Sequence, residues 1–434
     1  MTPQSQHTED KMDNTTTPAQ APEKGAKTRY FVLLLLVLVY TLNFLDRQVL
    51  SILKDSIKLD LHLTDAQLGW MGGVPFALFY CLFGIPAAWL ADRTSRVWIV
   101  TGALTLWSGF TAFCGLATNL TQLSIGRMGV GIGEAGGVAP AYSLISDYFS
   151  VKSRARALAI FSLGIPLGSA AGVLFGGLIA AHVNWRYAFL VIGAVGVGLA
   201  PMFRLLVRDP KRKTTPGAVQ PSLWSVAKLA AAKPSFWFLS TGSASASMVG
   251  YGVMYWMPTF LARSLKMDLI SRSQLFAGVL LIGGVIGVAL GGVLADKLGQ
   301  KSKRAYALIP AGAFLIAAPL YALGVLAKTP HEAFWLFLVP QALGLVWLGP
   351  VLTAVQHLAP SNSRSVMSSL FLLINNLLGI ALGTYAFGAL SDWLKPHYGL
   401  DSLKYAFLYA LGFYGLAGVL LIFGSFSLKK DWIA

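Results

Sequence analysis

The chain has 434 residues, of which 55% are hydrophobic and only 12% are charged, and its formal net charge is +16. A soluble domain has about 25% charged residues, so this composition excludes a water-soluble globular protein and indicates lipid as the solvent for most of the chain. The positive charge alone would favour nucleic acid as a partner, but its distribution along the chain, given below, excludes that class.

The first 28 residues are polar, and we expect a disordered cytoplasmic tail. They do not begin with an apolar segment, so no cleaved signal peptide is expected. The rest of the chain contains twelve apolar segments, each long enough to cross about 30 Å of hydrocarbon as a helix. Their expected limits are 29–53, 66–91, 97–117, 121–146, 155–181, 186–207, 235–261, 272–295, 305–327, 333–358, 364–391 and 403–427.

The twelve segments fall into two sets of six, which predict an N-terminal half over 29–207 and a C-terminal half over 234–427. Residues 208–233 between them are basic and interrupted by prolines, which predicts a cytoplasmic linker with a short amphipathic helix over 222–228 at the membrane surface. Residues 428–434 are expected to be a cytoplasmic C-terminus. The fold class predicted is an all-α membrane protein with twelve transmembrane helices in two six-helix halves.

The basic residues favour one side of the expected membrane. With the segments placed as above, 23 of the 34 lysines and arginines fall on the side of the N-terminus, 9 fall on the other side and 2 lie inside. Positive residues are enriched in cytoplasmic loops, so both termini are predicted to be cytoplasmic. This placement explains the net charge without a nucleic-acid partner.

A short motif occurs at equivalent positions of the two halves. Leu90-Ala91-Asp92-Arg93 ends the second apolar segment and Leu294-Ala295-Asp296-Lys297 ends the eighth, so that the aspartates at 92 and 296 lie 204 residues apart. Arg154 and Arg364 likewise mark the starts of the fifth and eleventh segments. Internal duplication of this kind is typical of secondary transporters.

The repeated motif resembles the pattern G-x-L-A-D-R-x-G-R-K of the major facilitator superfamily. The first copy has Ala88 and Ser95 in place of the two glycines, whereas the second keeps both, as Gly292 and Gly299. The stretch Arg127-Met128-Gly129-Val130-Gly131-Ile132-Gly133 is similar to the pattern R-x-x-x-G-x-G of the same superfamily. This resemblance covers nearly the whole chain and implies the major facilitator fold, in which the two halves alternate access to a central cavity.

Three further motifs resemble the spinster branch of that superfamily. They are Asn43-Phe44-Leu45-Asp46-Arg47, Gly133-Glu134-Ala135 and Gly164-Ile165-Pro166-Leu167-Gly168. The resemblance implies export of lysolipids or sphingoid phosphates, often coupled to protons. We expect a bacterial-type member that resides in the inner membrane as a monomer.

Four ionisable residues lie well inside the expected helices, all in the N-terminal half: Asp46, Arg47, Arg127 and Glu134. Such groups are costly in hydrocarbon and are functional candidates. Helix geometry predicts Asp46, Arg47 and Arg127 in the outer half of the bundle and Glu134 near the midplane. Because Arg127 and Glu134 are two turns apart, Asp46 is the expected partner of Arg127. We predict that the four residues couple protons to transport; the alternative is a fixed ion pair that only joins two helices.

The C-terminal half has no comparable charges, so the expected cavity is polar on one side and apolar on the other. Such a cavity suits an amphipathic anion whose phosphate is held by arginine. The alternative substrates are small organic anions, sugar phosphates or drugs. The residues predicted to bind substrate are Asn43, Arg47, Arg127, Glu134, Tyr251, Tyr255, Trp347, Asn375 and Asn376. For each aromatic residue alone, packing against lipid or the core is the alternative.

Charged residues at the cytoplasmic ends of the helices predict a gate, because acids there can bridge bases and helix N-termini. These residues are Asp92, Arg93, Arg96, Arg154, Asp296, Lys297 and Arg364. The alternative is a solvated loop whose charge only sets topology. No motif for a catalytic nucleophile, a metal or a nucleotide is present, so neither an enzyme nor a cofactor is expected. The predicted partners are an amphipathic small molecule, protons and membrane lipid.

Overall fold

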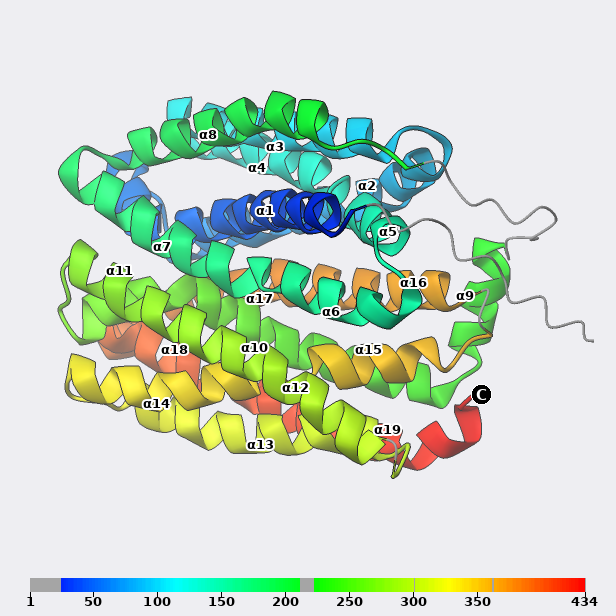
Figure 1. Ribbon diagram of the computed structural model, residues 1–434. Coiled ribbons are helices and arrows are strands. Elements are labelled where there is room, and N and C mark those ends of the chain that lie inside the picture. The colour runs from blue at the N-terminus through cyan, green and yellow to red at the C-terminus, as the bar shows by residue number, and fades with distance from the viewer. Residues whose placement is uncertain (1–24, 211–221, 300, 361–362, 434) are drawn as a thin grey trace, which may run out of the picture.

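The computed structural model describes residues 25–210, 222–299, 301–360 and 363–433, and these residues form helices with no β-strand. Figure 1 shows two groups of long helices, one above the other. The first group consists of α1 (Ala26–Leu61), α2 (Asp65–Arg93), α3 (Arg96–Leu116), α4 (Leu120–Ala135), α5 (Val138–Tyr148), α6 (Val151–Ser162), α7 (Gly164–His182) and α8 (Trp185–Leu206).

The second group consists of α10 (Pro234–Ser264), α11 (Leu269–Gly278), η1 (Val279–Gly283), α12 (Gly284–Gly299), α13 (Ala305–Val325), α14 (Pro330–Leu343), α15 (Leu348–Gln356), α16 (Arg364–Asn376), η3 (Leu377–Leu382), α17 (Gly383–Tyr398), η4 (Gly399–Asp401), α18 (Ser402–Ala410) and α19 (Gly412–Asp431).

We call the end of the molecule at which α1 begins and α19 ends the basic end, because most lysines and arginines fall on the side of the N-terminus. The opposite end, at which α1 ends and α2 begins, is the far end. They lie to the right and left of Figure 1.

Nine stretches of the described residues are helical, long and apolar enough to cross a membrane. One of them, Val366–Asp431, has 66 residues and contains two crossings, because the chain turns back at η4. The expected crossings 121–146 and 235–261 fall outside these nine. The first contains the charged residues Arg127 and Glu134, and the second is rich in serine. Both still run along the bundle, as α4–α5 and α10 (Figure 1), and the predicted all-α fold with twelve crossings in two halves is confirmed.

Four of the expected crossings are each formed by two consecutive α-helices. The breaks separate α4 from α5, α6 from α7, α14 from α15 and α18 from α19. In the first three cases the second helix has proline as its third residue, namely Pro140, Pro166 and Pro350. Proline is tolerated there because the first N–H groups of a helix have no carbonyl partner, whereas inside a continuous helix it removes a hydrogen bond. These predicted crossings are therefore present, each as two consecutive α-helices.

The first helix is two turns longer than expected. Lys54, Asp55 and Lys58 end the apolar segment in the sequence, but α1 continues to Leu61 and stops at His62. The backbone of His62 has the left-handed φ of 52°, and its N–H donates to the carbonyl oxygen of Lys58. The expected limit at residue 53 is wrong because these charged side chains bind groups of neighbouring helices, as described below.

Glycines at intervals of four residues let helices approach closely. Gly168, Gly172 and Gly176 lie on the face of α7 that packs against α1, and a Cβ at either of the first two would collide with a carbonyl oxygen of α1. Gly287 and Gly291 pack in the same way against the backbone of the α14–α15 segment. Small residues promote such packing in lipid, where hydrophobicity does not drive helices together.

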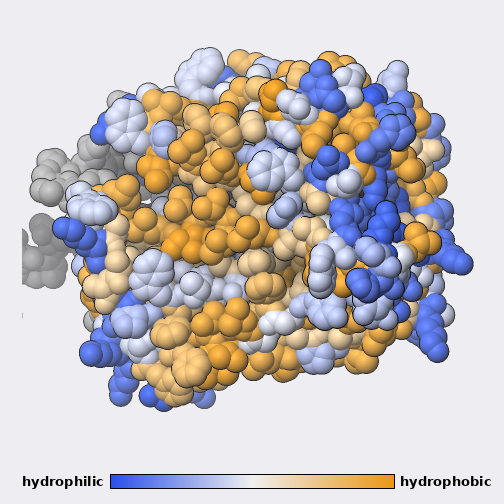
Figure 2. All heavy atoms as spheres, turned by 180° about the vertical axis from the view of Figure 1, so that it is seen from behind, coloured by the Kyte–Doolittle hydropathy of each residue, from blue (hydrophilic) through white to orange (hydrophobic). Residues whose placement is uncertain are grey.

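Large apolar side chains cover the outside of the helices. Phe175, Leu205 and Ile316 are 53%, 81% and 56% exposed. Figure 2 shows a broad hydrophobic surface across the middle of the molecule and more hydrophilic ends. A soluble protein rarely exposes an apolar surface this wide, so this surface faces lipid. The molecule is a multi-pass integral membrane protein.

The segment between the two groups is described at residues 207–210 and from residue 222, and residues 211–221, like residues 1–24, lie outside the described part of the chain. The amphipathic helix expected over 222–228 is present as α9 (Leu223–Ala231). Val226 and Ala230 are buried, whereas Trp224 is 69% exposed. This two-sided burial is the pattern of an amphipathic surface helix.

Candidate substrate and coupling site

Arg47 of α1 and Glu134 of α4 form an ion pair inside the first group of helices. The Nε atom of Arg47 lies 2.6 Å from Oε2 of Glu134. The Glu134 side chain is fully buried, whereas 14% of the Arg47 side chain is exposed. The structure therefore places Glu134 at the same level of the bundle as Arg47, whereas the sequence predicted Glu134 near the midplane and Arg47 in the outer half.

Three aromatic rings surround the Arg47 guanidinium. Its Cζ atom lies 5.0 Å from the centroid of Phe44, 4.9 Å from that of Phe76 and 5.0 Å from that of Tyr80. The electron-rich ring faces attract the cation within this distance. The rings and Glu134 thus hold the guanidinium in one place, while 14% of the Arg47 side chain remains exposed.

Asp46, next to Arg47 in the chain, points to a different helix. Its Oδ2 atom accepts a hydrogen bond from the hydroxyl of Thr111 in α3, whose single proton is shared with the carbonyl oxygen of Trp107. No hydrogen bond or ion pair joins Asp46 to Arg127 in the described part of the chain. The expected pairing of these two residues is therefore not formed, because Thr111, which the sequence analysis missed, supplies the donor.

Several buried polar atoms of this region have no hydrogen-bond partner among the described residues. Arg127 lies with its Cζ 4.9 Å from the ring centroid of Phe76, but two of its nitrogens make no hydrogen bond. Buried polar groups are rarely left unpaired in proteins, so this cluster has capacity to bind water, protons or a ligand. The unpaired atoms are Asn43 Nδ2 and Oδ1, Asp46 Oδ1, Arg127 Nε and Nη1, and Glu134 Oε1.

The polar candidates of the second group lie on α10 and α16. Ser247 donates to Oδ1 of the buried Asn375 at 2.9 Å, and both Asn376 and Tyr251 are half-buried. The π-helical turn η3 begins directly after Asn376. Since π-helical turns are frequent at functional sites, this part of the helix stays a candidate for substrate contact. Trp347 is buried and packs edge-on against Phe371.

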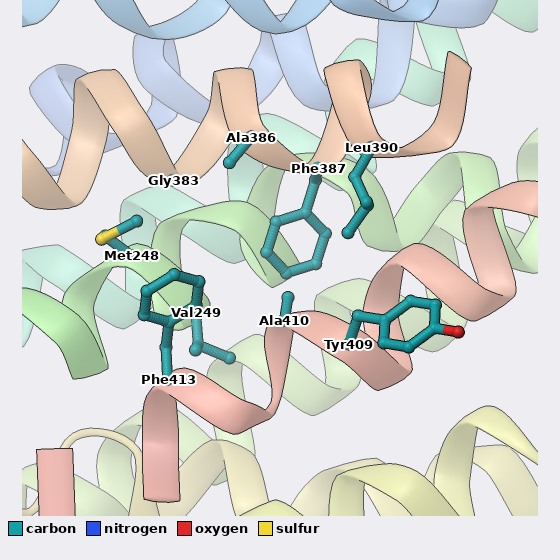
Figure 3. Close-up of a pocket in the computed structure, with 9 residues that line it drawn as sticks. All are labelled: Met248, Val249, Gly383, Ala386, Phe387, Leu390, Tyr409, Ala410 and Phe413. Carbon is teal, nitrogen blue, oxygen red and sulfur yellow. The ribbon is translucent and has the colours of Figure 1, made fainter. Parts of the chain in front are cut away.

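An apolar cavity of about 160 Å³ lies elsewhere in the second group, among α10, α17, α18 and α19. Figure 3 shows the apolar side chains of these helices converging on it. It is lined by none of the predicted substrate-binding residues, and its lining contains no charged side chain. The lining residues are Met248, Val249, Gly383, Ala386, Phe387, Leu390, Tyr409, Ala410 and Phe413.

The two groups of helices are joined at the far end by the carboxylate of Asp65, the first residue of α2. Arg263 of α10 donates to its two oxygens at 2.6 and 2.7 Å, and Ser391 of α17 donates at 2.9 Å. Lys58 of α1 pairs with the same carboxylate. Next to it, the backbone N–H of Ala66 donates to Asp392 at 2.7 Å.

A second carboxylate, Asp55 of α1, also joins the groups at the far end. It accepts hydrogen bonds from Arg272 of α11 at 2.9 Å and from Thr259 of α10 at 2.7 Å. Nearby, the hydroxyl of Tyr255 donates to the carbonyl oxygen of Leu68 at 2.8 Å. Tyr255, predicted to bind substrate, thus lies in the contact that closes the far end in this structure.

The sequence analysis missed the residues of this closure. Asp55, Asp65, Arg263 and Arg272 each lie near a limit of an expected apolar segment, where charged residues are commonly solvated. The available signal was that acids and bases occur together at the far-side ends of segments from both halves. Nothing in the sequence alone specifies which acid meets which base.

At the basic end, Arg96 of the predicted gate is buried and bound within the first group. It donates to Asp209 through Nε at 3.0 Å and Nη2 at 2.7 Å, and it also pairs with Asp147. Partial burial raises the pKa of the Asp209 carboxyl, but hydrogen bonds from Arg96 and Ser95 outweigh this effect and place the pKa below its usual value.

The other predicted gate residues lie at the same end. The Arg93 guanidinium stacks on the ring of Trp89 in its own helix at 4.0 Å, and Arg154 donates to the carbonyl oxygen of Ser146 at 2.8 Å. Asp296 and Lys297 are exposed, and Arg364 is half-buried. The side chain of Asp92 lies outside the described part of the structure. The gate stays a prediction.

Two groups of membrane-crossing helices, with charges buried between them, define a membrane transporter. The model of the Major Facilitator Superfamily matches residues 36–384, and the chain belongs to that superfamily.

Within the superfamily the chain is spinster-like and of the bacterial type. An MFS-type efflux pump of Mycolicibacterium smegmatis is 32% identical over 406 residues, which cover 92% of this chain and 93% of that protein. Protein spinster homolog 1 of Mus musculus is 28% identical over 397 residues, which cover 86% and 75%. A crystal structure of a bacterial homolog of the human lysosomal transporter spinster, inward-facing and unoccupied, matches with a TM-score of 0.85 at 30% identity, covering 95% of this chain and 100% of that one.

Proposed function

We propose that this spinster-like transporter moves an amphipathic anionic lipid, such as a lysophospholipid or a sphingoid phosphate, in a proton-coupled manner. The observation that carries the proposal is the Arg47–Glu134 pair, in which the acid is fully buried and the base is partly exposed. The family and the fold are those of a transporter, and we propose no enzymatic activity. The acting unit is the monomer.

The substrate's anionic head is proposed to bind at Arg47. A guanidinium offers a planar fork of donors that matches phosphate, and the three rings around it restrict its motion. The other residues proposed to surround the head on the side of the first group are Asn43, Arg127 and Glu134. The residues proposed to face the rest of the substrate are Tyr251, Trp347, Asn375 and Asn376. The apolar part of the substrate then lies toward the second group, which supplies no charge comparable to that of Arg47.

Proton coupling is proposed to follow from competition for Arg47. Ionised Glu134 binds the guanidinium at 2.6 Å, whereas a protonated Glu134 would release it for the phosphate of the substrate. Asp46 has one unpaired oxygen and is proposed as the second proton acceptor. A proton on Glu134 should therefore raise the affinity for an anion, so that proton and substrate binding are linked.

Alternating access is proposed to use the two ends of the molecule. The positive-inside bias supports the assignment of the basic end, and with it both termini, to the cytoplasm of a bacterial cell whose inner membrane holds the protein. The bonds of Asp55 and Asp65 close the far end here, which accords with the likeness to an inward-facing structure. In the opposite state, the charged residues of the basic end, Asp92 and Asp296 among them, are proposed to close the cytoplasmic side.

A second candidate is transport of drugs or of small organic anions and sugar phosphates. The relationship to the efflux pump of M. smegmatis favours it, since 32% identity extends over 92% of this chain. The ring-lined guanidinium at Arg47 would accept any compact anion, and it does not by itself require a lipid tail.

The test uses purified protein in liposomes with an imposed pH gradient. Fluorescent lysophosphatidylglycerol that crosses the bilayer is extracted with albumin, and uptake of glycerol 3-phosphate is measured in parallel. We expect lysolipid transport that depends on the gradient, and loss of that dependence in Glu134→Gln and Asp46→Asn. The control is Asp401→Asn, which changes an exposed acid that makes no helix-cap hydrogen bond. Transport of glycerol 3-phosphate alone would refute the lipid assignment, and gradient dependence that survives both variants would refute the coupling.

A further inference from the structure

Lys54 is a fully buried lysine at the contact between the two groups of helices. Its Nζ atom donates to the carbonyl oxygen of Ser51 at 2.7 Å and to that of Tyr255 at 2.5 Å. It also lies 5.1 Å from the ring centroid of Tyr255 and 5.2 Å from that of Trp256. The sequence analysis placed this lysine at the outer membrane side and gave it no role.

The neighbouring cations of the far end are paired differently. Lys58 and Arg263 bind the carboxylate of Asp65, and Arg272 binds that of Asp55. In contrast, the hydrogen-bond partners of Lys54 in the described part of the chain are two backbone carbonyls, one of them contributed by α10. The amine of Lys54 is thus buried without a carboxylate in direct contact among the described residues.

Burying an ammonium without an acid is costly, and carbonyl oxygens and ring faces compensate only in part. The carbonyl of Tyr255 and both rings belong to α10, in the opposite group. When the two groups separate at the far end, Lys54 loses these partners together and faces the opening. In that state its charge is free to bind an anion.

Lys54 also lies in line with Arg47 on α1. Seven residues are two helical turns, so the two side chains project from the same face, about 10 Å apart along the axis. On α10, Tyr251 and Tyr255 are one turn apart and share a face in the same way. A row of two cations therefore extends along α1 from the central site to the far end.

We propose that Lys54 is a second binding position for the anionic head of the substrate, used when the far end is open. The proposal rests on the proposed function, in which the substrate is an amphipathic anion. The phosphate leaves Arg47, moves two turns along α1 and binds the Lys54 ammonium, which is a compact point charge suited to phosphate. When the far end closes, the carbonyl of Tyr255 takes the place of the phosphate.

The test compares substrates of different net charge added at the far side of oriented proteoliposomes. Lysophosphatidylglycerol is anionic, whereas lysophosphatidylcholine is zwitterionic. In Lys54→Gln we expect the half-saturating concentration for the anionic lipid to rise on the order of tenfold, as for loss of one charge-assisted hydrogen bond. That for the zwitterionic lipid should rise less, because the choline cation offsets the attraction between its phosphate and Lys54. Lys54→Arg should restore the wild-type value.

Lys328→Gln is the matched control, because Lys328 is an exposed lysine between α13 and α14 at the same end. Thermal unfolding of each variant establishes that it is folded. An equal effect of Lys54→Gln on both lipids, or no effect on either, would overturn the proposal. If the wild-type protein transports only glycerol 3-phosphate, the lipid assignment fails, and the same Lys54 variants measured with glycerol 3-phosphate still decide whether Lys54 binds the anion.

Discussion

Replacing Asp65 by asparagine should open the far end. The Asp65 side chain is 3% exposed and binds Arg263 and Lys58, whose side chains are 20% and 25% exposed. Removing one member of a buried ion pair costs about 3–5 kcal/mol, and the partly solvated bases place the expected cost near the lower value, about 3 kcal/mol. This cost applies to the closed state alone, because the same groups are hydrated when the far end is open.

The cost translates into a change of populations. A loss of about 3 kcal/mol shifts an equilibrium roughly 100-fold, so that a protein about 99% closed becomes about half open. Asp55→Asn should act in the same direction through Arg272. The double substitution of Asp55 by Arg and Arg272 by Asp should recover part of the closed population, because it restores an opposite-charge pair.

The assay is the distance between spin labels at Leu116→Cys and Leu400→Cys, which are 63% and 80% exposed at the far ends of the two groups. The native Cys81 and Cys114 are replaced by alanine. We expect a second, longer distance in Asp65→Asn with about half of the population. Asp60→Asn is the control, since the Asp60–Arg186 pair joins helices of one group only. An unchanged distance distribution in Asp65→Asn would refute the role of Asp65 in closure.

Three further predictions concern stability, measured by thermal unfolding in detergent. Thr111→Val should lower stability by about 1.5–3 kcal/mol, because it removes the donor to the buried Asp46 carboxylate. Thr111→Ser keeps the hydroxyl and should leave stability unchanged. Equal stability of the two variants would contradict the hydrogen bond between Thr111 and Asp46. Gly168→Ala should lower stability through collision with the backbone of α1, in contrast to Gly198→Ala, whose Cβ meets open space. The pKa of Asp209 is lower in the folded protein than its ordinary value of about 3.9. The ionised carboxylate therefore stabilises the fold above that value, and this stabilisation is lost as the pH falls through the folded pKa. The difference in stability between wild type and Asp209→Asn should shrink below pH ~4, and a difference that stays constant would argue against the Arg96 bond.

The sequence was sufficient for the features that depend on local pattern. Apolar length predicted the crossings, and the repeated motif around Asp92 and Asp296 predicted two halves. The glycines of α7 recur at intervals of four residues, which is also a local pattern, and they pack closely against α1. These signals are reliable because lipid forces every crossing to be helical and apolar.

The sequence was insufficient where a choice between partners had to be made. Asp46 was expected to bind Arg127, yet it binds Thr111, because hydroxyls near a carboxylate leave no periodic signal. The first crossing was expected to end at residue 53, whereas α1 continues past Lys54, which contacts the second group. The helix breaks before Pro140, Pro166 and Pro350 could not have been predicted from proline alone, because other prolines, such as Pro75 and Pro319, lie inside continuous helices.

The shared carboxylate of Asp65 also bears on the kinetics of transport. One side chain binds Lys58 of its own group and both Arg263 and Ser391 of the other, so none of these bonds can be exchanged for water without disturbing the rest. Opening should therefore occur as one cooperative event with a large activation enthalpy. Turnover should consequently fall steeply on cooling, and partly opened forms of the far end should be too short-lived to accumulate.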